Sequence, residues 1–243
     1  MENIGVNESV ISWMVFWITY WSLGGWLTYK MQCDKTRKIE KLNKVVFTLF
    51  YNMVWTFFAS VLLSQLPLRM MTDSHIIIKI IMTYIITDIW FYHIHIMMHQ
   101  KQLYWTHKLH HEFPQPYALT ALYCSYYEAI FLNTFAAGLP VVVLQLSPIC
   151  AYLWFFISAA DSVLSHSGLN IPYIIDDYHD LHHKHFQYNY GISHLFDNIY
   201  NTRYINSMDK TENEKLELKE FSNLGNFKIN GLEDIKLEGL KSE

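Results

Sequence analysis

The chain has 243 residues, of which 51% are hydrophobic and only 16% are charged. The charged residues gather around residues 30–44 and after residue 208, and an apolar body with segregated charge is typical of membrane-spanning proteins. The formal net charge of -4 gives no indication of the basic surface that nucleic-acid binding requires.

Two apolar segments open the chain, residues 9–28 and 45–64. Each is long enough to cross about 30 Å of hydrocarbon as a helix. The segment between them is basic, whereas the loop at 65–75 carries only Arg69. The positive-inside rule therefore predicts that residues 29–44 are cytoplasmic and that the N-terminus lies on the opposite side.

A third apolar helix is predicted over residues 76–92, interrupted by Lys79 and Asp88, and it returns to the cytoplasmic side. Residues 129–165 are too long for one span and have prolines near the middle. They predict a hairpin of two helices of about 17 residues each, joined near residues 139–148. The predicted fold is all-α: a membrane bundle of about four spans, the last pair a hairpin, under a cytosolic histidine-rich cap.

The C-terminal segment differs from the rest in composition. Residues 208–243 are polar and rich in lysine and glutamate, which predicts a flexible tail. Residues 1–207 are then a single membrane-embedded domain.

Histidine is the unusual residue type. There are 13 histidines, and all but His75 lie between His93 and His194. Spacings of three and four residues place imidazoles on one helix face, and the predicted helices bring every cluster to the same membrane face. So many imidazoles exceed what one zinc ion needs and are sufficient for two metal ions, of iron, zinc, copper or nickel. The candidate metal ligands are His95, His99, His107, His110, His111, His166, His179, His182 and His183.

The spacing of these motifs from about Asp88 to Thr202 resembles the fatty acid hydroxylase and sterol desaturase superfamily. The stretches HKLHHE, SHSGLNIP and YHDLHHKHFQYNYG are most similar to the sterol 4-methyl oxidase and sterol 25-hydroxylase branch. The chain departs from the family pattern at Ile96, Leu169 and Asn201, which concerns the substrate more than the metal site.

The resemblance implies a di-iron oxygenase in which the nine histidines hold two non-haem irons. It implies O2 as co-substrate and electrons from NAD(P)H through a separate reductase or a small b-type cytochrome. It also implies the endoplasmic reticulum membrane, with the histidines facing the cytosol. The expected substrate is a lipid, foremost a sterol that is hydroxylated. Fatty acid hydroxylation and sterol desaturation are the alternatives within the superfamily.

Residues beside the clusters are expected to support them. No catalytic residue beyond the metal ligands is predicted. Acidic residues near metal ligands commonly orient the ligand N–H groups. The candidates for that role are Asp88, Glu112, Asp180 and Asp197. His93, His185 and His194 are expected to lie around the site or at the surface, and the alternative is that one of them is an extra metal ligand.

Three other classes remain as alternatives. A zinc-dependent membrane hydrolase would carry H-E-x-x-H, but Ile96 follows His95, and Glu112 follows the pair of histidines. A metal transporter would place its polar residues at the bilayer midplane, away from the helix ends. A haem-binding electron carrier would need few histidines.

Overall fold

The computed structural model describes residues 6–63, 75–170 and 177–205. The described residues form helices and contain no strand, so the predicted all-α class is confirmed. The compact unit Met1–Arg203 holds every element named below. The predicted tail at 208–243 and most of the predicted loop at 65–75 lie outside the described residues.

Five helical segments, not about four, are long and apolar enough to cross a membrane. The first three are α1 (Val6–Cys33), α2 (Leu42–Leu63) and α3 (Ile76–Met98). The fourth runs over Tyr126–Val143 and consists of α5 (Tyr126–Glu128), the π-helical η3 (Ala129–Thr134) and α6 (Phe135–Val143). The fifth is α7 (Pro148–Ser165). The count was too low because each arm of the hairpin has 18 residues, enough for a full span.

The sequence predicted that Pro140 lies in the turn of the hairpin, but the residue lies inside α6. Its ring leaves the carbonyl of Ala136 without the usual helical donor. The hydroxyl of Thr87 on α3 donates to that carbonyl at 3.1 Å, and the indole N–H of Trp154 on α7 donates to the next carbonyl, Ala137, at 2.8 Å. Neighbouring helices therefore satisfy this segment, and α6 continues to Val143 before the chain turns.

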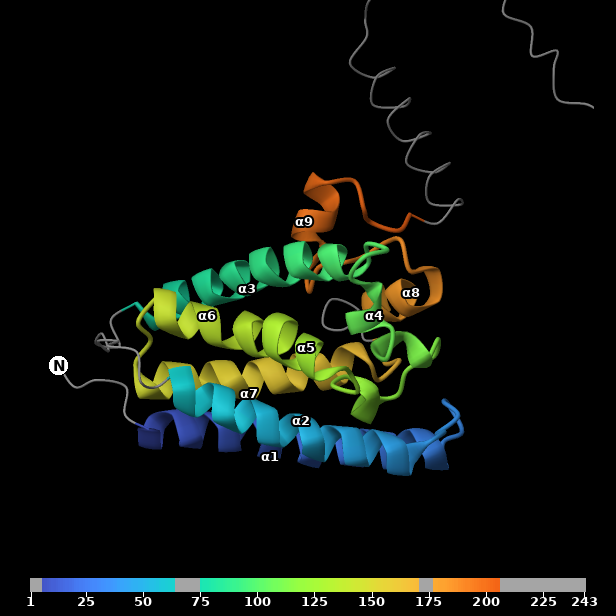
Figure 1. The fold of residues 1–243 in the computed structure, drawn as a ribbon, viewed down its shortest axis with the longest axis horizontal. Helices are drawn as coiled ribbons and strands as arrows, with labels where there is room; N and C mark the ends of the chain where they lie inside the picture. The colour runs from blue at the N-terminus through green and yellow to red at the C-terminus, as the bar shows by residue number, and fades with distance from the viewer. Residues whose placement is uncertain (1–5, 64–74, 171–176, 206–243) are drawn as a thin grey trace, which may run out of the picture. The chain divides into compact units, whose positions relative to one another are not determined.

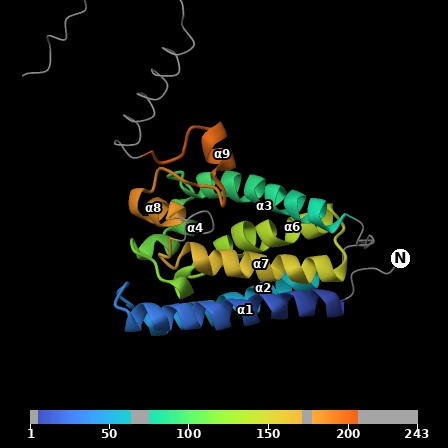
Figure 2. The same ribbon diagram turned by 180° about the vertical axis from the view of Figure 1, so that it is seen from behind.

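The spanning helices pack in pairs that differ from their order in the chain. Helix α1 packs along α7 and α2, and α3 packs along α6 (Figures 1 and 2). Tyr20 of α1 donates from its hydroxyl to the carbonyl of Leu119 at 2.9 Å and accepts from the N–H of Leu122 at 3.0 Å. Asn52 of α2 donates to the carbonyls of Leu122 and Cys124 at 3.1 Å each. The first two helices thus hold the chain that leads into α5.

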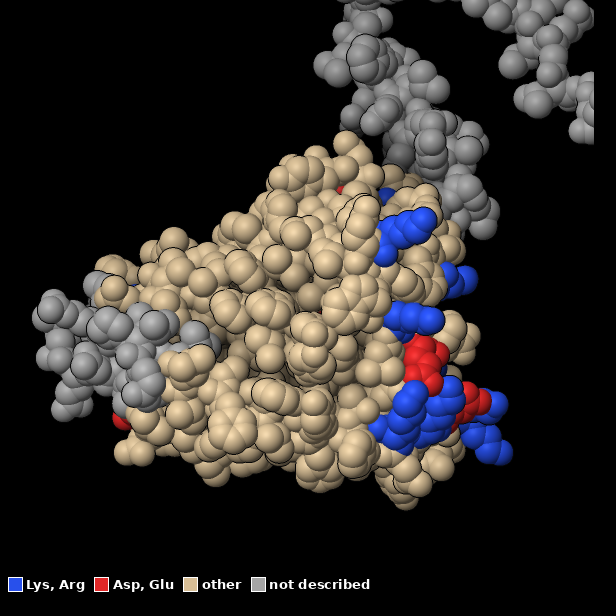
Figure 3. Space-filling model, viewed as in Figure 1, with Lys and Arg blue, Asp and Glu red and all other residues tan. Residues whose placement is uncertain are grey.

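Short helices form a cap at the end of the bundle where α3 and α7 finish (Figure 1). On the face shown in Figure 3, the lysine and arginine side chains also gather at that end. The cap consists of α4 (Tyr104–His107), η1 (His110–Glu112), η2 (Ala118–Thr120), α8 (Tyr178–His185) and α9 (His194–Ile199).

Candidate metal centre

The nine histidines predicted as ligands converge in the cap and form two groups. Within each group, one ligand atom from every residue lies within 4.8 Å of all the others. Group A contains His95, His99, His107, His111 and His182, and group B contains His110, His166, His179 and His183. The remaining described histidines, His75, His93, His185 and His194, belong to neither group.

Each pair of adjacent histidines is divided between the groups. His110 belongs to group B and His111 to group A, and His182 and His183 are divided in the same way. Successive side chains on a helix point about 100° apart, so neighbouring residues cannot face one ion. The doubled histidines therefore contribute one ring to each group.

The Nε2 atoms lie as close together as ligands of a shared ion. In group A, Nε2 of His107 lies 3.0 Å from Nε2 of both His95 and His111. In group B, Nε2 of His110 lies 3.1 Å from that of His183 and 3.3 Å from that of His166. Two nitrogens bound at right angles to one ion, each at about 2.1 Å, are separated by about 3.0 Å. The geometry therefore fits a metal ion in each group.

Burial keeps these rings neutral, the state in which they bind metal. Burial, followed by repulsion from His182, lowers the pKa of His99 to about 3. Burial also lowers the pKa of His182 to about 4, although a hydrogen bond to the Tyr188 carbonyl opposes the change. The pKa values of His111 and His183 are lowered for the same reason, reinforced by neighbouring imidazoles. At neutral pH the rings offer lone pairs to a cation.

Backbone carbonyls orient several rings. Nδ1 of His95 donates to the carbonyl of Tyr190 at 2.7 Å, and Nδ1 of His182 donates to that of Tyr188 at 2.7 Å. A carbonyl only accepts, so the proton is on Nδ1 and the lone pair of Nε2 faces the centre.

The loop that supplies these carbonyls is held by Asp88 and Asp197. Asp197 accepts from the N–H groups of Tyr190 at 2.9 Å and Gly191 at 2.7 Å, and Asp88 accepts from that of Ile192 at 3.0 Å. A Cβ on Gly191 would lie 2.9 Å from Asp88 Oδ1 and 3.0 Å from Asp197 Oδ2, so the carboxylates close around a residue without a side chain. The two acids contact the loop, which in turn contacts the imidazoles.

The other two acids join the cap to the basic segment after α1. Asp180 pairs with Arg37, and Glu112 accepts from Lys41 at 2.6 Å and Lys44 at 2.7 Å. Burial opposes ionisation of Glu112, but the hydrogen bonds from the lysines outweigh it and lower its pKa to about 2. In the part of the chain that the structure describes, Asp180 and Glu112 pair with this basic segment and not with an imidazole.

Glu128, in α5, was not predicted as a site residue, and it lies against both groups. It is 1% exposed, and its Oε2 lies 2.8 Å from Nδ1 of His107 in group A, a close contact without hydrogen-bond geometry. Its Oε1 lies 3.7 Å from Nδ1 of His110 in group B. The available signal was an isolated acid at the edge of a long apolar segment, which is costly there without a partner.

The histidines outside the groups make local contacts. Nδ1 of His93 pairs with the carbonyl of Ile89, one turn back in α3, at 2.7 Å. The ring of His194 packs on Tyr178, with centroids 4.3 Å apart. His75 stands just before α3, at the helix end that does not carry group A.

Both groups open on one cavity of about 560 Å³, here called the central cavity. Its polar wall includes rings from each group, and its other walls come from α3, η3 and α7. The lining rings are His95, His107, His110, His166 and His179. A molecule in this cavity would therefore meet both groups at once.

A family model described as "Fatty acid hydroxylase" matches residues 80–202, which include all nine grouped histidines. Methylsterol monooxygenase erg25B of Aspergillus fumigatus is 26% identical over 212 residues, 77% of this chain and 72% of that protein. Methylsterol monooxygenase 1 of Gallus gallus is 30% identical over 149 residues, 56% of this chain and 50% of that protein.

A relative with a different substrate in its name is also similar. The sphingolipid C4-hydroxylase sur2 of Schizosaccharomyces pombe is 35% identical over 123 residues, 46% of this chain and 42% of that protein. The chain thus spans about half the length, or less, of the chicken and fission-yeast relatives. No solved structure matches the chain.

Proposed function

Because the chain belongs to the fatty acid hydroxylase family, we propose that it is a di-iron oxygenase that hydroxylates a membrane lipid, most of all a sterol. Its five apolar helices make it an integral membrane protein. The observation that carries the proposal is the pair of buried histidine groups that open on one cavity.

The donor set fits two iron ions. Imidazole is a suitable ligand for iron, and both groups present converging lone pairs on rings that burial keeps neutral. Group A would hold one ion and group B the other. Bound iron would supply O2 activation, the chemistry that no side chain provides and that oxidation of a lipid C–H bond requires.

The residues of this chain hold and isolate that chemistry. The carbonyls of Tyr188 and Tyr190 fix two rings of group A, and Glu128 contacts a ring of each group. Such contacts raise the basicity of metal ligands and hold their rings in place. The central cavity lies between helices at the cap end of the bundle, so the lipid carbon can be placed against both groups with little water present.

A sterol is the proposed substrate because methylsterol monooxygenases recur among the relatives. A long-chain sphingolipid base is the second candidate, because a sphingolipid C4-hydroxylase is 35% identical to this chain. The proposed electron source is NAD(P)H, through a reductase or a small b-type cytochrome. We place the cap on the cytosolic side of the endoplasmic reticulum membrane, since the basic segment after α1 pairs with cap residues.

The zinc-hydrolase and transporter alternatives receive less support from the site. Glu128 contacts the Nδ1 side of His107 and His110, whereas the Nε2 atoms face the centre of each group. Glu128 is therefore not placed as the base of an H-E-x-x-H site. The grouped histidines lie in the cap and at its helix ends, whereas a transport site is expected near the bilayer midplane.

The test combines metal content with lipid analysis. The full chain is expressed in a yeast strain that lacks its own sterol 4-methyl oxidase, and sterols, fatty acids and sphingolipids are measured together. Loss of 4-methyl sterols or a new oxygenated sterol is the expected result, with about two irons per purified chain. A hydroxylated long-chain base with unchanged sterols would select the second candidate. Unchanged lipids together with one zinc per chain would contradict the proposal.

A further inference from the structure

We propose that the alkyl tail of the lipid lies in a second cavity, lined by α1, α2, η3, α6 and α7, while the reacting part of the lipid occupies the central cavity. This inference rests on the proposed function and assigns the place of the substrate. The second cavity, here called the tail cavity, has a volume of about 110 Å³, so it is smaller than the central cavity.

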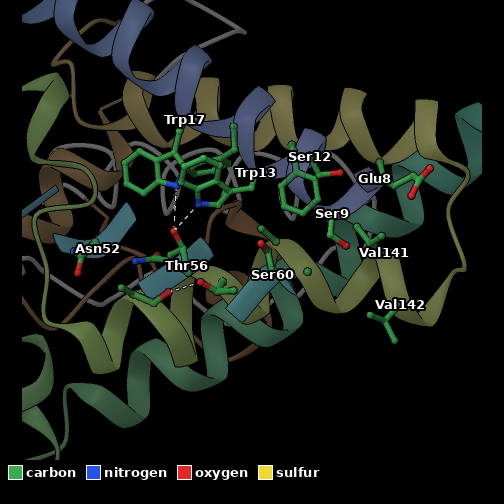
Figure 4. Close-up of a pocket in the computed structure, with 18 of the residues that line it drawn as sticks. Glu8, Ser9, Ser12, Trp13, Trp17, Asn52, Thr56, Ser60, Val141 and Val142 are labelled. Atoms are coloured by element: carbon green, nitrogen blue, oxygen red, sulfur yellow. Dashed lines mark hydrogen bonds between the residues drawn. The ribbon is translucent and has the colours of Figure 1, made fainter. Parts of the chain in front are cut away.

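The tail cavity has an apolar wall suited to hydrocarbon. Trp13 and Trp17 line it from α1, and both indole N–H groups donate to the hydroxyl of Thr56 on α2, at 3.2 and 3.1 Å (Figure 4). These donors are therefore satisfied within the wall. Across the cavity, small residues of α6 and α7, such as Ala137 and Ala151, leave room for an occupant.

The two cavities adjoin each other. Leu122 and Asn133 line both of them, so the tail cavity begins where the central cavity ends. From Asn133 the lining continues along η3 and α6 to Val142, a rise of roughly 13 Å. An extended alkyl chain placed there would run along the bundle, away from the histidines.

Half of this wall lies outside the family match. The α1 and α2 lining comes from residues 8–17 and 52–60, whereas the family model covers residues 80–202. The metal groups lie wholly within the family match, whereas the tail cavity draws part of its wall from the first two helices. The first two helices would select the length and shape of the tail without touching the metal ligands.

The contribution of the tail cavity is positional. A tail that enters from the bilayer leaves hydrocarbon, not water, so its transfer gains little hydrophobic free energy. A tail held at a fixed depth instead determines which carbon of the lipid faces the histidines. A sterol side chain and the tail of a long-chain base share this chemistry.

The experiment fills the cavity in the full-length, iron-loaded enzyme. Ala137→Leu and Ala151→Leu each place an isobutyl group in the wall. Val143→Leu is the matched control, because Val143 is 56% exposed on the same helix α6 and does not line the cavity. Each of these variants is assayed with two pairs of lipids. One pair is a 4-methyl sterol with and without its side chain, and the other is a long-chain base with a long or a short tail.

The filled variants should lose about tenfold in turnover of the long-tailed member of the accepted pair, because the added side chain occupies the space that the tail needs. The short-tailed member should be oxidised as by the unmodified enzyme, and iron content should not change. The pair that shows the loss identifies the source of the tail. Equal turnover of the long-tailed lipid by the filled variants and by Val143→Leu would overturn the inference.

A second measurement does not depend on activity. The unmodified protein is irradiated with the same lipids carrying a diazirine at the end of the tail. Adducts are expected on α1 or α7 residues of the wall, such as Phe16 and Phe155. Adducts confined to residues that do not line the tail cavity would refute the inference. Adducts at Phe16 with no oxidised lipid would support the tail cavity while contradicting the oxygenase proposal.

Discussion

The cap and the first two helices differ in the kinds of residue that they contain and in how far those residues are buried. In the cap, imidazoles, carboxylates and backbone carbonyls lie at short range from one another, and most of these side chains are buried. In α1 and α2, aromatic and aliphatic side chains are widely exposed, Phe47 by 74% and Ile18 by 60%, as expected of surfaces that meet lipid. The cap therefore depends on exact polar geometry, whereas the outward faces of α1 and α2 depend on apolar contact with their surroundings.

The largest effect is expected from the divided histidines of the cap. His111→Ala and His183→Ala each remove one ring from a different group, and each should abolish lipid oxidation and lower the iron content while the protein stays in the membrane. Oxidation products and iron per chain are measured together. His75→Ala is the control and should leave lipid oxidation and iron content close to those of the unmodified protein, because His75 precedes the start of α3 and the ligands lie at the end of that helix. Full activity in either ligand variant would contradict the site assignment.

The second-largest effect is expected from a change at Glu128. Glu128→Gln keeps the shape of the side chain but replaces one of the two carboxyl oxygens that face His107 and His110 with an amide nitrogen. Iron affinity should fall by about 10- to 100-fold, as is usual when a partner of metal ligands is lost. Competition with a chelator measures the affinity. Asn133→Asp, a polar change on η3 in the wall of the same cavity, tests whether any polar alteration there has the same effect; equal losses would remove the special role of Glu128.

Asp88 and Asp197 should have a smaller effect, since they act through the loop. Asp197→Asn leaves the N–H groups of Tyr190 and Gly191 with a weaker acceptor, and the free energy of unfolding should fall by about 1–3 kcal/mol. Thermal unfolding in detergent measures the loss. Activity should fall with it, and added iron should restore part of the activity because the ligands themselves are intact. A variant as stable as the unmodified protein would show that the carboxylate charge is not needed.

The smallest effect is expected at Glu112, where the cap meets the basic segment. Its pKa is lowered from 4.5 to about 2, so its ionised form stabilises the folded protein above pH 4.5, and this contribution disappears as the pH falls toward 2. Surface pairs of this kind contribute about 1 kcal/mol or less. The Tm of Glu112→Gln should therefore lie slightly below that of the unmodified protein at pH 6, and the difference should shrink between pH 4.5 and 3. A difference that does not change with pH would exclude the carboxylate as its cause.

The sequence predicted the cap better than the connections within it. The helical class and the histidine clusters follow from local spacing, and the structure brings all nine histidines together, although their role as ligands stays a prediction. Which of His110 and His111 joins which group depends on where α3 and α8 lie around them, which spacing does not specify. Glu128 was missed for the same reason, since an acid at the start of an apolar helix resembles an interfacial residue.

The hairpin shows a second limit of prediction from the sequence. Pro140 and Pro148 both favoured a break between residues 139 and 148, but only Pro148 begins a helix. A proline inside a helix is tolerated when another helix supplies the missing donor, as Thr87 does here. That donor comes from far away in the chain, so local sequence could not reveal it. A similar long-range contact, between Arg37 and Asp180, joins the segment after α1 to α8.

The division of each doubled histidine between groups A and B has a consequence for assembly. An ion that captures His111 and His182 also fixes the backbone from which His110 and His183 project, so loading one site prepares the other. Iron uptake should consequently be cooperative: a titration of the metal-free protein would pass from empty to doubly loaded chains with few singly loaded ones. The cell would then hold this protein either complete or inert, with little of a half-assembled form able to react wrongly with oxygen.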